Sequence, residues 1–210
     1  MRFLINQKTF WASILLLALF FVLFYYFNFF NVDSSKNQIQ TLHIQQLRNL
    51  PKLETLDIIL RTGIDYDSRI IQQISKSRFS HIGMIIQTNP ISIIHASSSD
   101  TQNKVAISSF DYFLQHSKGI AIKRYVLNQH QKEKIQAFLK KQIGKDFSFH
   151  PQNPLYCTTL IQNAFDEGFN QENYLNLKKQ KIDLPIFGGD FLMPEAFYQD
   201  SKSQLIFEYF

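Results

Sequence analysis

The stretch FSHIGMIIQTNPISIIHA, residues 79–96, decides how this chain is expected to fold. Two apolar runs rich in isoleucine, 81–87 and 91–96, flank the turn-forming residues 88–90. The pattern predicts a β-hairpin. Because side chains alternate between the two faces of a strand, the length of the turn decides which side chains share a face.

The hairpin carries two histidines, His81 and His95. If the turn consists of residues 88–90, Met84 and Ile94 are directly opposite each other, and the histidines lie diagonally on one face. A turn that is one residue shorter or longer places the histidines on opposite faces. Two imidazoles on one face are difficult to explain as core packing, although each histidine alone is typical of a core or surface group.

Cys157 is the single cysteine of the chain, which excludes an internal disulfide and a cysteine-based zinc site of the usual spacing. The surrounding stretch YCTTLIQNAF, residues 156–165, predicts a helix with an apolar face. Cys157 lies where this helix begins, so the backbone N–H groups are expected to lower the pKa of its thiol and to hold an oxyanion. A lone cysteine in this position is also typical of a small buried hydrophobic residue.

The three candidate residues fit one mechanism when the hairpin has the favourable register. His81 then takes the proton of Cys157, and His95 orients His81 or stabilises its charged form. A metal site is the other use of two facing histidines, but no HExxH or comparable ligand spacing accompanies them. No cofactor is expected.

Length and charge limit the remaining possibilities. The 210 residues suit one domain with an appendage, and the net charge of +5 comes without a Lys/Arg cluster interleaved with aromatics. Nucleic acid is therefore not expected as a partner, and nothing indicates an oligomeric state. Further strands are predicted at 56–61, 104–107 and 120–126, helices at 69–75 and 131–143 and after Ser109, and irregular structure from Lys181 onward.

Residues 10–30 (FWASILLLALFFVLFYYFNFF) contain no charged side chain and are long enough to span a bilayer as a helix. Arg2 and Lys8 precede this stretch, which predicts an N-terminus inside the cytoplasmic membrane and a catalytic domain outside it. We therefore expect a single-pass anchor at 1–30, a tether with a short helix at 31–52 and a hydrolase domain at 53–210.

Four segments, in this order, resemble the circularly permuted NlpC/P60 cysteine hydrolases of the YiiX/YebB-like group. They are LDII at 56–59, SRFSHIGMI at 77–85, IIHA at 93–96 and YCTTLI at 156–161. The resemblance covers most of the chain from about residue 53 to residue 197. It implies an α+β papain-like fold with an antiparallel sheet packed against the helix that carries the nucleophile.

The resemblance also implies the nucleophile at Cys157 and the base at His81, and it places His95 where relatives carry a third polar residue. Two positions depart from the family pattern: Leu56, where members often have glycine, and Thr159, where they often have glutamate.

The predicted function is cleavage of an amide through a thioester intermediate, with a cell-wall peptide as the first substrate class. The alternatives are a lipid acyl hydrolase or acyltransferase, which would take a lipid amide, and a binding domain that has lost the chemistry.

Overall fold

The structure is a computed structural model that describes residues 19–20, 22–23, 43–47, 49–98, 101–183 and 188–210. The chain divides into two units, Met1–Gln38 and Ile39–Phe210. The transmembrane helix predicted for residues 10–30 lies outside the described residues except for four exposed helical positions, Leu19, Phe20, Val22 and Leu23. Among the helices of the described part, none is both long enough and apolar enough to cross a membrane.

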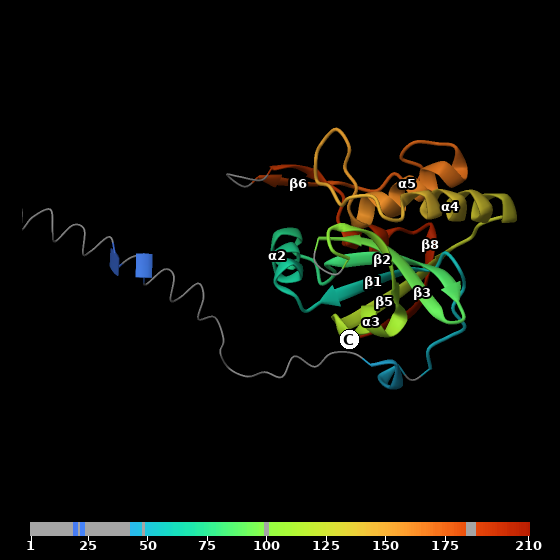
Figure 1. Cartoon of the computed structure of the whole chain (residues 1–210), viewed down its shortest axis with the longest axis horizontal. Coiled ribbons are helices and arrows are strands. Elements are labelled where there is room, and N and C mark those ends of the chain that lie inside the picture. The colour runs from blue at the N-terminus through green and yellow to red at the C-terminus, as the bar shows by residue number, and fades with distance from the viewer. Residues whose placement is uncertain (1–18, 21, 24–42, 48, 99–100, 184–187) are drawn as a thin grey trace, which may run out of the picture. The chain divides into compact units, whose positions relative to one another are not determined.

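A six-stranded antiparallel sheet forms the centre of the second unit (Figure 1). Its strand order is β4-β3-β2-β1-β5-β8. The predicted hairpin is present in this order as β2 and β3. The strands are β1 (Ile58–Gly63), β2 (His81–Thr88), β3 (Ile91–Ser97), β4 (Lys104–Ser109), β5 (Ser117–Tyr125) and β8 (Ser203–Tyr209).

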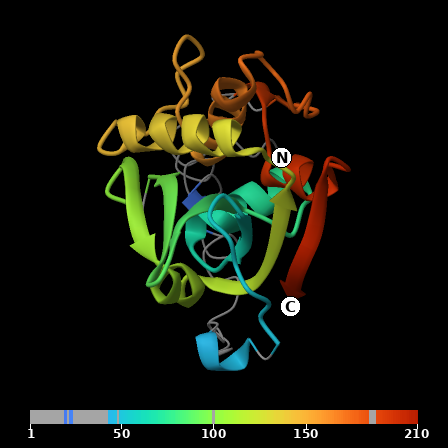
Figure 2. The same ribbon diagram turned by 90° about the vertical axis from the view of Figure 1, so that its right-hand side faces the viewer.

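Helices cover both faces of the sheet (Figures 1 and 2). On one face α5 (Cys157–Phe169) packs against β2 and β3, and α4 (Gln129–Gln142) packs against α5. On the other face lies α3 (Phe110–Gln115), whose N-cap Ser109 accepts a hydrogen bond from Tyr112 N. The α+β arrangement, with an antiparallel sheet against the helix that carries Cys157, is therefore confirmed.

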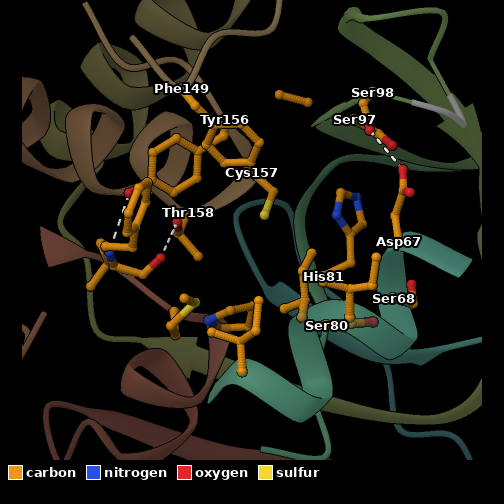
Figure 3. Close-up of a pocket in the computed structure, with 18 of the residues that line it drawn as sticks. Asp67, Ser68, Ser80, His81, Ser97, Ser98, Phe149, Tyr156, Cys157 and Thr158 are labelled. Carbon is orange, nitrogen blue, oxygen red and sulfur yellow. Dashed lines mark hydrogen bonds between the residues drawn. The ribbon is translucent and has the colours of Figure 1, made fainter. Parts of the chain in front are cut away.

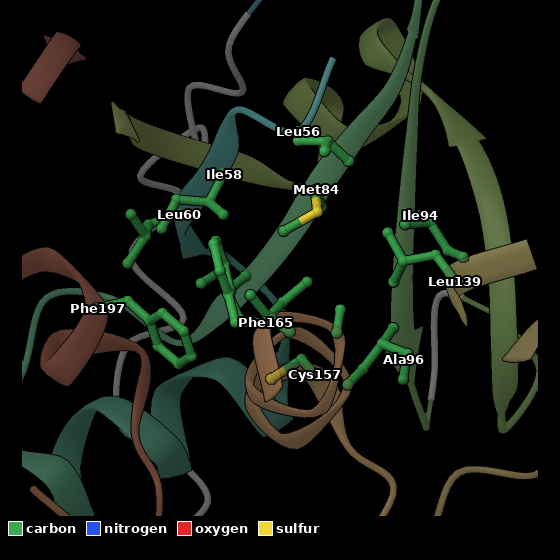
Figure 4. Packing of buried hydrophobic residues seen from close by; sticks show 14 of the residues in the cluster. Leu56, Ile58, Leu60, Met84, Ile94, Ala96, Leu139, Cys157, Phe165 and Phe197 are labelled. Carbon is green, nitrogen blue, oxygen red and sulfur yellow. The ribbon is translucent and has the colours of Figure 1, made fainter. Parts of the chain in front are cut away.

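Strand alternation explains why the sheet has two apolar faces. Leu60 and Met84 point into the cluster that contains Phe165 of α5 (Figure 4), whereas the neighbouring Ile59 and Ile85 point into the cluster that contains α3. Because these strands are buried on both sides, they appear in the sequence as continuous apolar runs.

Irregular structure was predicted from Lys181 onward, and this prediction is wrong. The tail forms a β6–β7 hairpin (Gln180–Asp183 and Gly188–Phe191), then α6 (Pro194–Gln199), and then β8. Strand β8 joins the main sheet beside β5, far away in the sequence. Pairing with β5 stabilises β8, so the local pattern of residues 203–209 did not identify this segment as a strand. The remaining elements are α2 (Tyr66–Ser75) and a short 3-10 helix, Ile44–Gln46.

The surroundings of Leu56 explain how leucine is tolerated where family members often have glycine. Its φ of 74° lies in the left-handed region, which glycine adopts more readily than any other residue. The side chain is 2% exposed within the core, and its N–H donates to Ile85 O at 2.7 Å. Burial of the leucine side chain therefore offsets the backbone strain that a glycine would avoid.

Candidate active site

The hairpin has the register that brings the two histidines onto one face, but not for the predicted reason. Its turn has two residues, because Thr88 pairs directly with Ile91. A bulge in β2 then shifts the register by one residue, so that Met84 faces Ile94 as a three-residue turn would have placed it. The shared face is therefore confirmed and the predicted turn length is wrong.

The two histidines contact each other directly. His81 Nε2 lies 2.9 Å from His95 Nδ1, and the rings meet edge to face. The Phe113 ring packs beside both, with centroid distances of 5.8 Å and 5.5 Å. Gly83 permits this arrangement, because a Cβ at that position would lie 2.5 Å from Ile93 Cγ2. Both imidazoles are buried, so each is held by its neighbours in one orientation.

Cys157 is the first residue of α5, and its sulfur faces the His81 ring in the same pocket (Figure 3). The start of the helix is held by Thr159, whose hydroxyl oxygen accepts the N–H of the N-cap Tyr156 at 2.8 Å. Thr159 is thus the N3 residue of a capping box, a position that glutamate also commonly fills.

The predicted lowering of the thiol pKa is wrong. Burial raises the pKa of the Cys157 thiol to about 11. The N–H groups of Ile82, Thr158 and Cys157 itself, together with the charge of Arg61, act in the opposite direction, but the cost of burying a thiolate is larger. Helix position alone suggested a lower pKa because a sequence does not show how deeply its cysteine is buried.

Burial also lowers the pKa of His81 well below its ordinary value, and the positive charge of Arg61 and the neighbouring His95 add to this effect. The two shifts have the same consequence. Both shifts favour a neutral thiol and a neutral imidazole over the ion pair at neutral pH.

Sequence reasoning missed Arg61, a buried charged residue of the site. It lies on β1 directly opposite His81, is 2% exposed and lines the same pocket. Its guanidinium lies over the Phe113 ring, 4.8 Å from the centroid, and 4.0 Å from the Asp65 carboxylate. An arginine inside the apolar run LDIILR was the available signal, because a buried charge in a strand is rare.

Ser108 was also missed, and the sequence carries no signal for it. Its Oγ lies 2.8 Å from His95 Nε2, on the opposite side of that ring from His81. The contact exists because β3 pairs with β4 and brings residues of the two strands side by side.

The pocket has a volume of about 410 Å³, within the range of small-molecule sites. Its wall beyond Cys157 is held in place by two hydrogen bonds: Leu192 N–H donates to the Tyr156 hydroxyl, and the Thr158 hydroxyl donates to Leu192 O. Most of the lining is apolar and comes from α2, from the segment before α5 and from the tail. Examples are Ile70, Ile71, Ile74, Phe149, Phe191 and Leu192.

The comparisons with known proteins identify the family of this chain. A family model described as "Permuted papain-like amidase enzyme, YaeF/YiiX, C92 family" matches residues 53–207. The chain belongs to this family. Membership in the permuted papain-like amidases makes it an amide-cleaving cysteine hydrolase at the level of the family.

Several solved structures share the fold of this amidase. One of them is the crystal structure of metalloprotein yiiX from Escherichia coli O157:H7, with a TM-score of 0.64, 16% identity, and coverage of 76% of this chain and 99% of that chain. A comparison with curated proteins gives no significant match.

A metal site was the other predicted use of the two facing histidines. Within the described residues, no group of three or more His, Cys, Asp or Glu side chains is arranged to hold a metal ion. The facing nitrogens of His81 and His95 are occupied with each other at 2.9 Å.

Proposed function

We propose that Cys157 is the nucleophile of this amidase, that His81 is its general base and that His95 orients His81. The observation that carries the proposal is the contact between His81 Nε2 and His95 Nδ1, because it leaves His81 Nδ1 as the nitrogen available to the thiol. The sulfur and the His81 ring face each other in one pocket that a substrate carbonyl can enter.

The reaction begins from the neutral pair. As the sulfur attacks the carbonyl carbon, His81 Nδ1 takes the thiol proton, so the thiolate does not need to exist in the resting enzyme. The carbonyl oxygen becomes an oxyanion near the N–H groups of Cys157 and Thr158 at the start of α5. The C–N bond then breaks, and the amine leaves with the proton from His81.

A thioester on Cys157 remains. His81, neutral again, takes a proton from a water molecule that attacks the thioester, and the C–S bond breaks to release a carboxylic acid and the free thiol. The buried charge of Arg61 favours each anionic state of this cycle and disfavours the imidazolium.

The lining of the pocket favours an amide whose acyl group is apolar, such as a lipid amide. Most of its surface is apolar, with several isoleucine and phenylalanine side chains, and burial of each substrate CH₂ is favourable by about 0.8 kcal/mol. A cell-wall peptide, the class predicted first from the sequence, is the second candidate. Two charged side chains, Arg61 and Asp67, also line the pocket and suit the charged groups of a peptide.

The experiment compares p-nitroanilides with a dodecanoyl and an acetyl group, and a D-Glu-containing stem peptide, with the full chain in mild detergent. Cys157→Ala is expected to abolish turnover of every substrate. Ile74→Asn, in the pocket, is expected to lower kcat/KM for the dodecanoyl substrate by at least about tenfold relative to the acetyl substrate. Leu205→Asn, an exposed position on β8 outside the pocket lining, is the matched control.

Turnover of the stem peptide, together with equal kcat/KM for the dodecanoyl and acetyl substrates, would favour a cell-wall peptide as the substrate. Turnover by Cys157→Ala would contradict the assignment of the nucleophile.

We also propose that residues 10–30 anchor the enzyme in the cytoplasmic membrane with the hydrolase unit outside. The support is the uncharged apolar stretch and the preceding Arg2 and Lys8. Protease added to intact spheroplasts that express the full chain is expected to degrade the hydrolase unit. Survival of that unit until the spheroplasts are lysed would contradict this orientation.

A further inference from the structure

A chain of hydrogen bonds runs from the pocket to β4, the edge strand of the sheet. His81 Nε2 lies 2.9 Å from His95 Nδ1, and His95 Nε2 lies 2.8 Å from Ser108 Oγ. Each residue comes from a different strand: β2, β3 and β4. His95 is fully buried, whereas Ser108 is half-buried, so the chain begins in the pocket and ends near solvent.

This chain has two possible directions, because a neutral imidazole carries one N–H and one acceptor nitrogen. In the first, His81 Nε2–H donates to His95 Nδ1, and His95 Nε2–H donates to Ser108. In the second, Ser108 donates to His95 Nε2, His95 Nδ1–H donates to His81 Nε2, and the proton of His81 lies on Nδ1. Only the first direction leaves a lone pair on His81 Nδ1 for the proton of Cys157.

The partner at the outer end permits the first direction. Ser108 is the partner of His95 Nε2, and a serine hydroxyl can accept one hydrogen bond while donating another. Because Ser108 is half-exposed, its own hydrogen can be donated to water while its oxygen accepts from His95.

We propose that Ser108 is a positioning residue of this amidase: its oxygen accepts His95 Nε2–H and so selects the tautomer of both histidines in which His81 is a base. The proposal rests on the function proposed above, since it assigns the base to His81. No proton travels along the chain. When His81 takes the proton of Cys157 it carries an N–H on both nitrogens, and the Nε2–H remains donated to His95.

The test uses the full chain in detergent with ¹⁵N-labelled histidine, and reads the protonated nitrogen of each imidazole by NMR without any substrate. Wild type is expected to show both His81 and His95 protonated on Nε2 near neutral pH. Ser108→Ala is expected to give His95 a substantial population protonated on Nδ1.

Two variants separate positioning from general damage. Ser108→Thr retains the hydroxyl and is expected to retain the wild-type tautomers. Ser109→Ala removes the neighbouring hydroxyl, which caps α3 rather than contacting His95, and is expected to lower thermal stability without changing either tautomer.

Wild-type tautomers in Ser108→Ala, or a change of tautomer in Ser109→Ala of equal size, would overturn the proposal. Because the tautomers are read without turnover, the two proposals fail separately. If NMR shows the expected tautomers but the amidase assay shows no activity, the proposed function is rejected and the selection of the tautomers by Ser108 stands.

Discussion

The protonation of Cys157 yields the sharpest prediction. Alkylation by iodoacetamide requires the thiolate, and burial raises the pKa of this thiol from an ordinary value of 9.0 to about 11. The difference is about two pKa units, so below about pH 9 the thiolate fraction is about 100-fold lower than that of an ordinary thiol. We expect alkylation to be slow at neutral pH and to rise with pH without a plateau below about pH 10.

The assay follows the mass of the intact full chain in detergent, because Cys157 is the only cysteine and each added group reports on that residue. The same chain unfolded in guanidinium serves as the reference thiol. Arg61→Met removes a charge that favours the thiolate and is expected to move the alkylation profile to higher pH, whereas Arg61→Lys retains the charge and most of the wild-type profile.

A plateau of fast alkylation between about pH 5 and pH 8 would refute this reasoning. It would mean that Cys157 and His81 form an ion pair in the resting enzyme, and that the N–H groups at the start of α5 outweigh burial.

Three further predictions concern stability. The pKa of His81 is lower in the folded than in the unfolded chain, so its stability contribution is present above about pH 6.5 and is lost as the pH falls, with a limiting slope of about 1.4 kcal/mol per pH unit. His81→Gln is expected to reduce this acid sensitivity in urea unfolding, and an unchanged pH dependence would contradict it. Gly83→Ala places a Cβ 2.5 Å from Ile93 Cγ2 and is expected to lower the free energy of unfolding by about 1–3 kcal/mol. An unchanged free energy of unfolding would contradict this prediction. Thr158→Val removes the hydrogen bond to Leu192 O and leaves that buried carbonyl unpaired, so it is expected to lower the free energy of unfolding by about 1–3 kcal/mol. An unchanged Tm would contradict this prediction and would mean that water replaces the hydroxyl.

Local patterns in the sequence were sufficient to predict the strands and the helix around the site. The isoleucine-rich runs of the hairpin and the apolar face after Cys157 have the periods of a strand and a helix, and both elements formed where they were predicted. The lone cysteine and the two hairpin histidines were likewise visible, because each is an unusual residue in an apolar segment.

The tertiary structure decided what depends on distant residues. The bulge that sets the hairpin register, the pairing of β8 with β5 and the contact of His95 with Ser108 are properties of strand pairs, and no single segment encodes them. The pKa of Cys157 is also decided there, because desolvation depends on everything packed around the sulfur. The sequence by itself determined which residues are available for catalysis, since side-chain chemistry and local periodicity are written in it. Their protonation and hydrogen-bond partners arose only when the strands and α5 packed together.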